Sequence, residues 1–459
     1  MKALILLSSL GVVSLLAEIF SFKKLLYPLV VIGLLATIVI NMFDWNLPKN
    51  VFFGMMQYDH FAVAFSSVIL IVALLWFVVS TRFFESESSM TDRFSLVLFA
   101  LAGAVVMVSY TNMTMLFLGI EILSISMYIL AGSKKDDLGS NESAFKYLIM
   151  GAFATGFLLF GITLIYGSTG SFDLAEINNF LAAHKGTMPM IFYAGVLLML
   201  IGLSFKVSAA PFHFWAPDVY QGAPTAITAF MATIVKTAAF AAFLRLFLSS
   251  FASVSELWVG VLVVMSGITL LVGNITAVFQ TNVKRMLAYS SVAHAGYILL
   301  ALIAGNTYSI SSILYYTAAY SIGSIGTFSI LWIISNARGT DNTIESFNGL
   351  GKTNPFLAVI MTIALLSLAG IPPTAGFFAK YYIFTAAFKS GYTNIVLIAI
   401  IASLIGVYYY FKIIIAMFFK EPTTEDSIII DLNQKLVLLI VAITTIALGL
   451  FPDFIIRLL

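Results

Sequence analysis

The chain has 459 residues, of which 61% are hydrophobic, 14% aromatic and 10% charged, and its mean hydropathy is +1.04. This composition excludes a soluble globular domain and indicates an integral membrane protein. The formal net charge is only +2, and the absence of a basic, aromatic-rich cluster excludes nucleic acid as a partner. The absence of cysteine excludes thiolate-held iron–sulfur clusters, CxxC zinc sites and thiol redox chemistry.

The amino terminus, MKALILLSSLGVVSLLAEIF, places one lysine before an apolar stretch. This pattern is typical of a secretory signal peptide or of a first membrane span. Leu16 and Glu18 occupy positions where a cleavage site needs small residues, so we expect a span.

A helix needs roughly 20 apolar residues to cross the hydrocarbon core. By that measure the sequence predicts an all-α polytopic membrane protein with about 14 transmembrane helices. We expect the spans to begin near residues 3, 25, 60, 94, 112, 145, 189, 223, 257, 283, 309, 355, 392 and 435. The longest connections between them, around 168–188 and 335–354, are too short to form a soluble domain.

The distribution of cations predicts the orientation. Loops after odd-numbered spans hold fourteen lysines and arginines, whereas the termini and the other loops hold six. Cation-rich loops face the cytoplasm. An even number of spans places both termini on one side, so we predict both termini outside a bacterial inner (plasma) membrane.

Four charged residues, Glu121, Lys206, Lys236 and Lys380, fall inside apolar runs. A charge at the bilayer centre costs about 2.5–3.5 kcal/mol on insertion scales and is rare unless it lines an interior path. A single ion pair would equally fit a structural role in helix packing. One glutamate cannot satisfy three lysines, so at least one lysine is predicted to give up its proton part of the time.

Prolines interrupt two of the predicted spans. The run over 190–216 contains Pro211, five residues after Lys206. The run over 355–388 contains Pro372 and Pro373, and Lys380 follows seven residues after Pro373. A proline removes a helical hydrogen bond, and freed backbone groups at membrane depth need protein or water as partners. A kink that only bends a packed helix is the structural alternative.

The two broken spans are the seventh and the twelfth. This spacing predicts two five-helix repeats, inverted because five is odd. We therefore expect one membrane domain over 1–459, composed of N-terminal helices (1–92), a first repeat (93–250), a second repeat (251–420) and a C-terminal helix (421–459).

Other motifs carry less information. His294 lies in a predicted span and is a candidate relay, although a lone histidine on an apolar helix is more often a hydrogen-bonded core residue. None of the four histidines has a second ligand at i+3 or i+4, so we expect no metal or haem site. NGLGKTN (348–354) lacks the first glycine of a phosphate loop and is predicted to be a helix connector.

Three stretches, FKVSAAPFHFWAPDVYQGAPT (205–225), VKRMLAYSSVAHAGY (283–297) and LSLAGIPPTAGFFAKYYIF (366–384), resemble the antiporter-like membrane subunits of respiratory complex I, the NADH-quinone oxidoreductase. The sequence WAPDVYQGAPT and the lysine at position 380 fit the N-type subunits better than the sister subunits. The resemblance covers roughly 95–415 by motif and the remaining helices by hydropathy alone.

The resemblance implies functions for individual residues. By motif, Glu121, Lys206, Lys236 and Lys380 match the central proton-carrying groups of the family. Lys146, in SAFKYLIMGAF, matches a further lysine, but at a predicted span edge it could be an ordinary anchor.

The resemblance also implies proton translocation in a translocase, driven by electron transfer from NADH to quinone. This chain is expected to hold no redox centre and no cofactor, with NADH, FMN, iron–sulfur clusters and quinone bound by other subunits. The expected partners are the other membrane subunits, including sister antiporter-like subunits, and the lipid bilayer.

Three alternatives share these features. A subunit of a cation/proton antiporter or membrane-bound hydrogenase would carry the same helices and lysines. A solute transporter would bind its substrate at the broken helices and would need a roomy cavity there. A membrane scaffold would use the charges only as a structural ion network.

Overall fold

The computed structural model describes residues 1–459 except 21, 46–48, 86–89, 185–187, 340–341 and 423–426. Its chain forms two compact units. Unit 1 comprises 1–77, 81–207 and 234–262, and unit 2 comprises 78–80, 208–233 and 263–459. Almost all of the described residues in secondary structure are helical, which confirms the predicted fold class.

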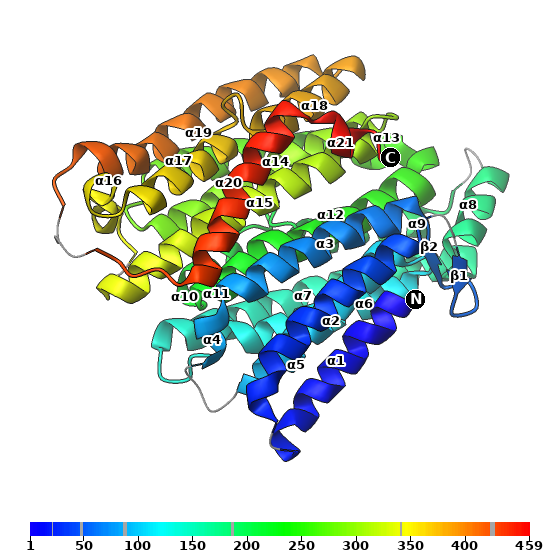
Figure 1. Cartoon of the computed structure of the whole chain (residues 1–459). Helices are drawn as coiled ribbons and strands as arrows, with labels where there is room; N and C mark the ends of the chain where they lie inside the picture. Colours follow the sequence, from blue (N-terminus) through cyan, green and yellow to red (C-terminus); the bar gives the residue numbers. More distant parts are fainter. Residues whose placement is uncertain (21, 46–48, 86–89, 185–187, 340–341, 423–426) are drawn as a thin grey trace. The chain divides into compact units, whose positions relative to one another are not determined.

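Unit 1 consists of apolar helices and one short hairpin (Figure 1). Its elements are α1 (Lys2–Ile19), α2 (Lys23–Phe43), β1 (Lys49–Val51), β2 (Met56–Tyr58), α3 (His60–Val79), α4 (Thr81–Glu85), α5 (Met90–Ser109), α6 (Met113–Ala131), α7 (Leu138–Thr169), α8 (Leu174–Ala183), α9 (Met190–Lys206) and α12 (Lys236–Leu244), followed by a π-helical turn (Arg245–Ser250), a 3₁₀ turn (Ala252–Val254) and the start of α13 (Ser255–Val278).

Unit 2 contains the rest of α13 and the other helices (Figure 1). These are α10 (Trp215–Gly222), α11 (Thr225–Phe230) with the first part of the π-helical turn Met231–Val235, α14 (Val283–Ala304), α15 (Ser309–Arg338), a 3₁₀ turn (Ile344–Phe347), α16 (Leu350–Thr353), α17 (Pro355–Ala369), α18 (Ala375–Lys389), α19 (Thr393–Phe419), α20 (Leu432–Leu450) and α21 (Asp453–Ile456).

The apolar helices agree with the predicted spans. Among the described residues, twelve helical segments are long and apolar enough to cross a membrane. The two shorter apolar helices are α9 and α17, and these are the first halves of the two spans predicted to be broken. Every predicted span therefore corresponds to an apolar helix.

The boundaries and connections differ from the prediction in places. The sixth span begins at Leu138 rather than near 145, because Asp137 caps α7 through a side-chain bond to the Gly139 amide. The predicted loop over 168–188 contains α8, capped in the same way by Asp173. The predicted connector at 348–354 is confirmed as a short helical link, α16.

Glycines allow close helix packing inside unit 1. A Cβ atom on Gly103 of α5 would lie 2.8 Å from the Gly119 carbonyl of α6, and one on Gly161 of α7 would lie 2.8 Å from the Gly195 carbonyl of α9. Small residues at helix crossings let backbones approach closely in membrane proteins. These crossings hold α6 against α5 and α9 against α7, and α6 also packs on α7.

Candidate functional site

One face of α6 binds the lysine at the end of α9. Lys206 is 7% exposed, and its Nζ donates to Ser124 Oγ at 2.7 Å and to Tyr128 OH at 3.4 Å. Glu121, Ser124 and Tyr128 follow an i, i+3, i+7 spacing and therefore share one helix face. The α6 hydroxyls, rather than the Glu121 carboxylate, are the direct partners of this lysine.

Glu121 is half-buried, and its Oε1 atom is shielded from solvent without a hydrogen-bond partner among the described residues. The carboxylate lies on the same face of α6 as Ser124 and Tyr128, the hydrogen-bond partners of Lys206. A buried carboxylate oxygen without a donor is costly, so such an atom needs an explanation beyond packing.

The first helix break follows Lys206 directly, because α9 ends at this residue. Ser208 adopts a positive φ of 60° and Pro211 follows, so the predicted break is present, but the helix ends five residues before the proline that predicted it. Because Pro211 has no N–H, the carbonyl four residues earlier, at Val207, lacks its helical donor. Pro217 lies in the first turn of α10, where a proline is tolerated, and makes no break of its own.

Lys236 is 2% exposed and is the first residue of α12. The π-helical turn Met231–Val235 precedes it, and a second one, Arg245–Ser250, follows the helix. Single π-helical turns occur often at functional sites because they displace one residue from the regular ladder. Within Thr225–Ser250, the 18-residue apolar stretch that includes this lysine is completely buried. Protein therefore encloses the lysine.

The second break binds the lysine of α18. Lys380 is 6% exposed, and its Nζ donates to the Ala369 carbonyl at 2.6 Å and to Ser403 Oγ of α19 at 2.8 Å. The ammonium also lies 4.9 Å from the centre of the Tyr297 ring, within reach of a cation–π attraction. Ala369 is the last residue of α17, and Gly370 ends that helix with a positive φ of 84°.

His294 is fully integrated into a hydroxyl network of unit 2. Its Nδ1 lies 2.6 Å from Tyr316 OH and its Nε2 lies 3.2 Å from Tyr410 OH, and the side chain is buried. Tyr410 also hydrogen-bonds Ser290. Both ring nitrogens therefore contact a group that can donate or accept a proton.

A small cavity connects this histidine with the second break. It offers about 10 Å³ to water, roughly one molecule, and is lined by residues that include His294, Tyr316, Ser367, Gly376 and Ala379. Ser367 and Gly376 lie on opposite sides of the break and are hydrogen-bonded to each other at 3.1 Å. Ala379 precedes Lys380 in the chain.

Lys146 has a different environment. It lies eight residues inside α7 and pairs with Glu142, one turn earlier, at 2.6 Å. The lysine side chain is 37% exposed and the glutamate 64% exposed. An exposed i, i+4 pair of this kind contributes only a few tenths of a kcal/mol. Lys146 therefore remains a secondary candidate.

The structure adds partners that the sequence analysis did not name: Ser124, Tyr128, Tyr316, Ser403 and Tyr410. The spacing of Ser124 and Tyr128 from Glu121 was a usable signal. Tyr316, Ser403 and Tyr410 lie on other helices than their partners, and no local pattern points to them. No cluster of His, Asp and Glu that could hold a metal ion occurs among the residues described in the structure.

Apolar helices throughout, with a buried lysine at each of two helix breaks, define a polytopic membrane protein built around titratable groups inside its spans. Comparison with known proteins identifies the family. A family model described as "NADH:quinone oxidoreductase/Mrp antiporter, TM" matches residues 110–406. The chain belongs to this family, as the sequence motifs predicted.

Similar curated proteins cover the whole chain. The NADH-quinone oxidoreductase subunit N of Cytophaga hutchinsonii is 46% identical over 459 residues, which covers 100% of this chain and 99% of that protein. The NADH-quinone oxidoreductase subunit N of Flavobacterium psychrophilum is 43% identical, with 100% of both chains covered.

Solved structures of related membrane complexes contain chains with the same fold. A chain of respiratory complex I from Thermus thermophilus with bound aureothin superposes with a TM-score of 0.86 at 31% identity, covering 99% of this chain and 98% of that one. A chain of the archaeal membrane-bound sulfane sulfur reductase gives a TM-score of 0.89 at 28% identity, covering 100% of this chain and 96% of that one. A chain of the Mrp complex from Dietzia also gives 0.89, but at 21% identity it shares the fold alone.

Proposed function

We propose that this chain is a proton-translocating membrane subunit of a bacterial NADH-quinone oxidoreductase, of the N type. Full-length relatives at 46% and 43% identity carry that name, which favours this assignment over a subunit of an Mrp-type antiporter or a membrane-bound hydrogenase. Its partners are the other membrane subunits of the complex, including sister antiporter-like subunits, and the bilayer.

The observation that carries the proposal is the pairing of buried lysines with helix breaks. Lys206 ends α9 just before the first break, and Lys380 bonds the carbonyl that the second break leaves free. Charged groups inside spans are costly and mark ion pathways. Irregular backbone at membrane depth is tolerated where protein or water satisfies it.

In the proposed mechanism, Glu121 and Lys206 form a coupled pair. Movement of the Glu121 carboxylate toward a neighbouring subunit would weaken its attraction for the Lys206 ammonium, and the proton would pass on to Lys236 and finally to Lys380. His294, with a proton-exchanging hydroxyl at each ring nitrogen, would serve the part of the route in unit 2.

The proposed chain carries protons and no electrons. Quinone reduction would take place in other subunits, which would bind NADH, FMN, iron–sulfur clusters and quinone, and long-range coupling would deliver the energy. The cation distribution of the loops favours an orientation in which both termini lie outside the bacterial inner membrane.

A solute transporter fits the geometry less well. The cavity beside the second break, in the part of the chain that the structure describes, has space for about one water molecule. Ligand pockets usually measure about 300–1,000 Å³. This space suits proton exchange through water and is too small for an organic solute.

The test is to neutralise the coupled pair in the assembled complex. Glu121→Gln and Lys206→Met should each abolish quinone-dependent proton uptake, while assembly is retained. Quinone reduction and proton uptake are measured together on the same preparation, and Lys389→Met, an exposed lysine of α18, is the control. Unchanged proton uptake with an intact complex would show that the charges form only a structural ion network.

A further inference from the structure

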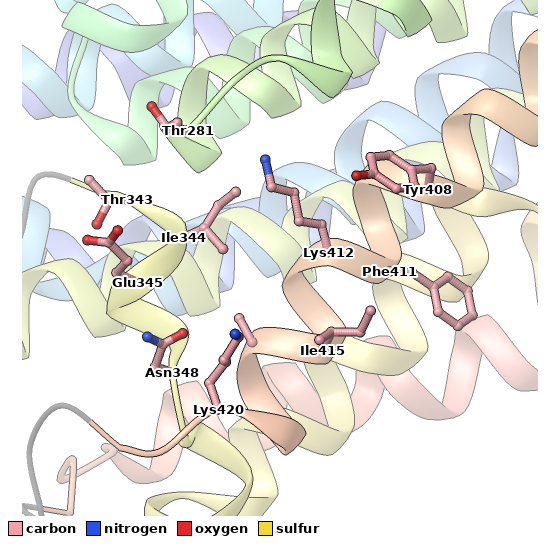
Figure 2. Close-up of a pocket in the computed structure, with 11 residues that line it drawn as sticks. Thr281, Thr343, Ile344, Glu345, Asn348, Tyr408, Phe411, Lys412, Ile415 and Lys420 are labelled. Atoms are coloured by element: carbon pink, nitrogen blue, oxygen red, sulfur yellow. The ribbon is translucent and has the colours of Figure 1, made fainter.

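A second cavity in unit 2 lies away from the buried lysines. Its volume is about 740 Å³, well inside the range of ligand pockets. One wall is the carboxyl-terminal part of α19, and the other is the connector over 343–348 together with Thr281 (Figure 2). None of the proposed proton-carrying residues lines it.

The α19 wall combines apolar and basic side chains in one stripe. Tyr408, Phe411, Lys412 and Ile415 follow an i, i+3, i+4, i+7 spacing, and Lys420 directly follows the helix. Tyr408 is 61% exposed and Ile415 is 46% exposed, so the apolar part of the stripe is open to the surroundings of the chain. In Figure 2 the amino group of Lys412 extends from α19 toward Thr281.

The basic end of the stripe lies at the depth of lipid headgroups. α19 has 27 residues, which corresponds to about 40 Å of helix against a hydrocarbon core of about 30 Å. Lys412 lies seven residues before its end, about 10 Å along the axis, within reach of the interface for a long side chain. The cation distribution predicts that this end faces the cytoplasm.

The charges select the ligand. Lys412 and Lys420 have no ion-pair partner within the described part of the chain, whereas neighbouring Lys352 pairs with Glu421 at 3.0 Å. Glu345 is the one acidic residue among the lining residues, so the cavity carries one net positive charge. A lipid headgroup with one negative phosphodiester and no positive group of its own would balance that charge.

We propose that this cavity binds one anionic phospholipid, with its phosphodiester between Lys412 and Lys420 and its acyl chains along Tyr408, Phe411 and Ile415. Basic pockets between helices at the cytoplasmic side recognise anionic headgroups in this way. A zwitterionic lipid would bring an extra ammonium into a cavity that is already positive. The proposal is independent of the proton path.

The test measures lipid retention in the assembled complex. The complex is reconstituted in nanodiscs that contain equal amounts of phosphatidylglycerol and phosphatidylethanolamine, extracted with mild detergent, and analysed for bound lipid by native mass spectrometry. Each lysine near the surface changes the affinity for an anionic lipid by about fivefold, so Lys412→Gln with Lys420→Gln should reduce retained phosphatidylglycerol about 25-fold.

Two control variants and a comparison of the two lipids decide the outcome. Lys435→Gln removes an exposed lysine of α20 that does not line the cavity and should retain the lipid. Glu345→Gln should strengthen retention. Equal retention by the double variant and by Lys435→Gln, or equal retention of phosphatidylethanolamine, overturns the proposal.

A second measurement separates lipid from protein. A benzophenone side chain at Ile415 should crosslink to phospholipid in the assembled complex, since this position faces outward. Crosslinking to another subunit instead would show that the cavity is a protein interface and would overturn the proposal.

Discussion

The Lys380 ammonium donates a hydrogen bond of 2.6 Å to the Ala369 carbonyl, eleven residues earlier in the chain. In an unbroken helix this carbonyl would accept from the amide of residue 373. That residue is Pro373, which has no N–H. The lysine therefore replaces the missing backbone donor. The break supplies a carbonyl acceptor for the buried ammonium, and the ammonium supplies a donor for the free carbonyl.

Replacement of Lys380 by methionine should abolish the proton transfer that depends on it. We expect coupled proton uptake to fall by about 10²-fold or more, the range for loss of an acid–base group. Lys380→Arg should fail as well, because a guanidinium does not release its proton. Proton uptake in proteoliposomes measures the effect, and Lys389→Met, on the same helix, is the control. Full activity of Lys380→Arg would contradict a function in proton exchange.

Removal of the Ser124 hydroxyl should weaken the Lys206 site. A hydrogen bond to a charged group contributes about 1.5–3 kcal/mol, so Ser124→Ala is expected to lower proton uptake by about tenfold to 10²-fold. Tyr128→Phe should have a smaller effect because its contact is longer, at 3.4 Å. Ser126→Ala is the matched control, since among the described residues the Ser126 hydroxyl donates to the Ile122 carbonyl of its own helix and to no other group. Equal losses for Ser124→Ala and Ser126→Ala would point to a general effect on α6.

His294→Phe should interrupt the hydroxyl network of unit 2. The imidazole contacts Tyr316 OH and Tyr410 OH through its two nitrogens, and phenylalanine keeps the packing but removes both contacts. We expect a loss of proton uptake of about 10²-fold. His184→Phe, at the exposed end of α8, should have no effect. A His294→Phe complex with normal uptake and a normal solvent isotope effect would leave this histidine a core residue only.

Gly376→Ala should damage the second break by steric overlap. A Cβ atom at this position would lie 1.7 Å from the Ser367 carbonyl oxygen, so α17 and α18 would have to move apart. Overpacking of this kind typically costs about 1–3 kcal/mol. Thermal unfolding of the complex should therefore shift to lower temperature. Gly156→Ala in α7 meets no atom within 4 Å and should be neutral or slightly stabilising; a neutral Gly376→Ala would mean that the break tolerates repacking.

The sequence predicts the helices, their breaks and the buried lysines because each depends on local information. Twenty apolar residues make a span whatever surrounds them, and Pro211 or Pro373 interrupts a helix through its own covalent structure. The cost of burying a charge likewise follows from position alone, which singled out Glu121, Lys206, Lys236 and Lys380.

The hydrogen-bond partners could not be predicted in this way. Ser403 and Tyr410 lie on α19, and their contacts with Lys380 and His294 depend on how α14, α18 and α19 pack. The sequence singled out Glu121 and Lys206 as buried charges, but it did not show that the lysine donates to the Ser124 and Tyr128 hydroxyls. Side-chain geometry at a crossing of two helices decides such choices. The structure divides the chain into two compact units, with divisions at 207/208 and 233/234. This division does not test the predicted five-helix repeats, which remain a prediction.

The anchoring of Lys380 has a consequence for how it can exchange its proton. An ammonium group has three N–H bonds, and two of them are directed at Ala369 and Ser403. A neutral amine keeps two N–H bonds and gains a lone pair, so both anchors survive loss of the third hydrogen. The nitrogen can therefore stay in place while the lysine loses and regains its proton. The group that moves is then the proton acceptor or donor that contacts the third position on the nitrogen.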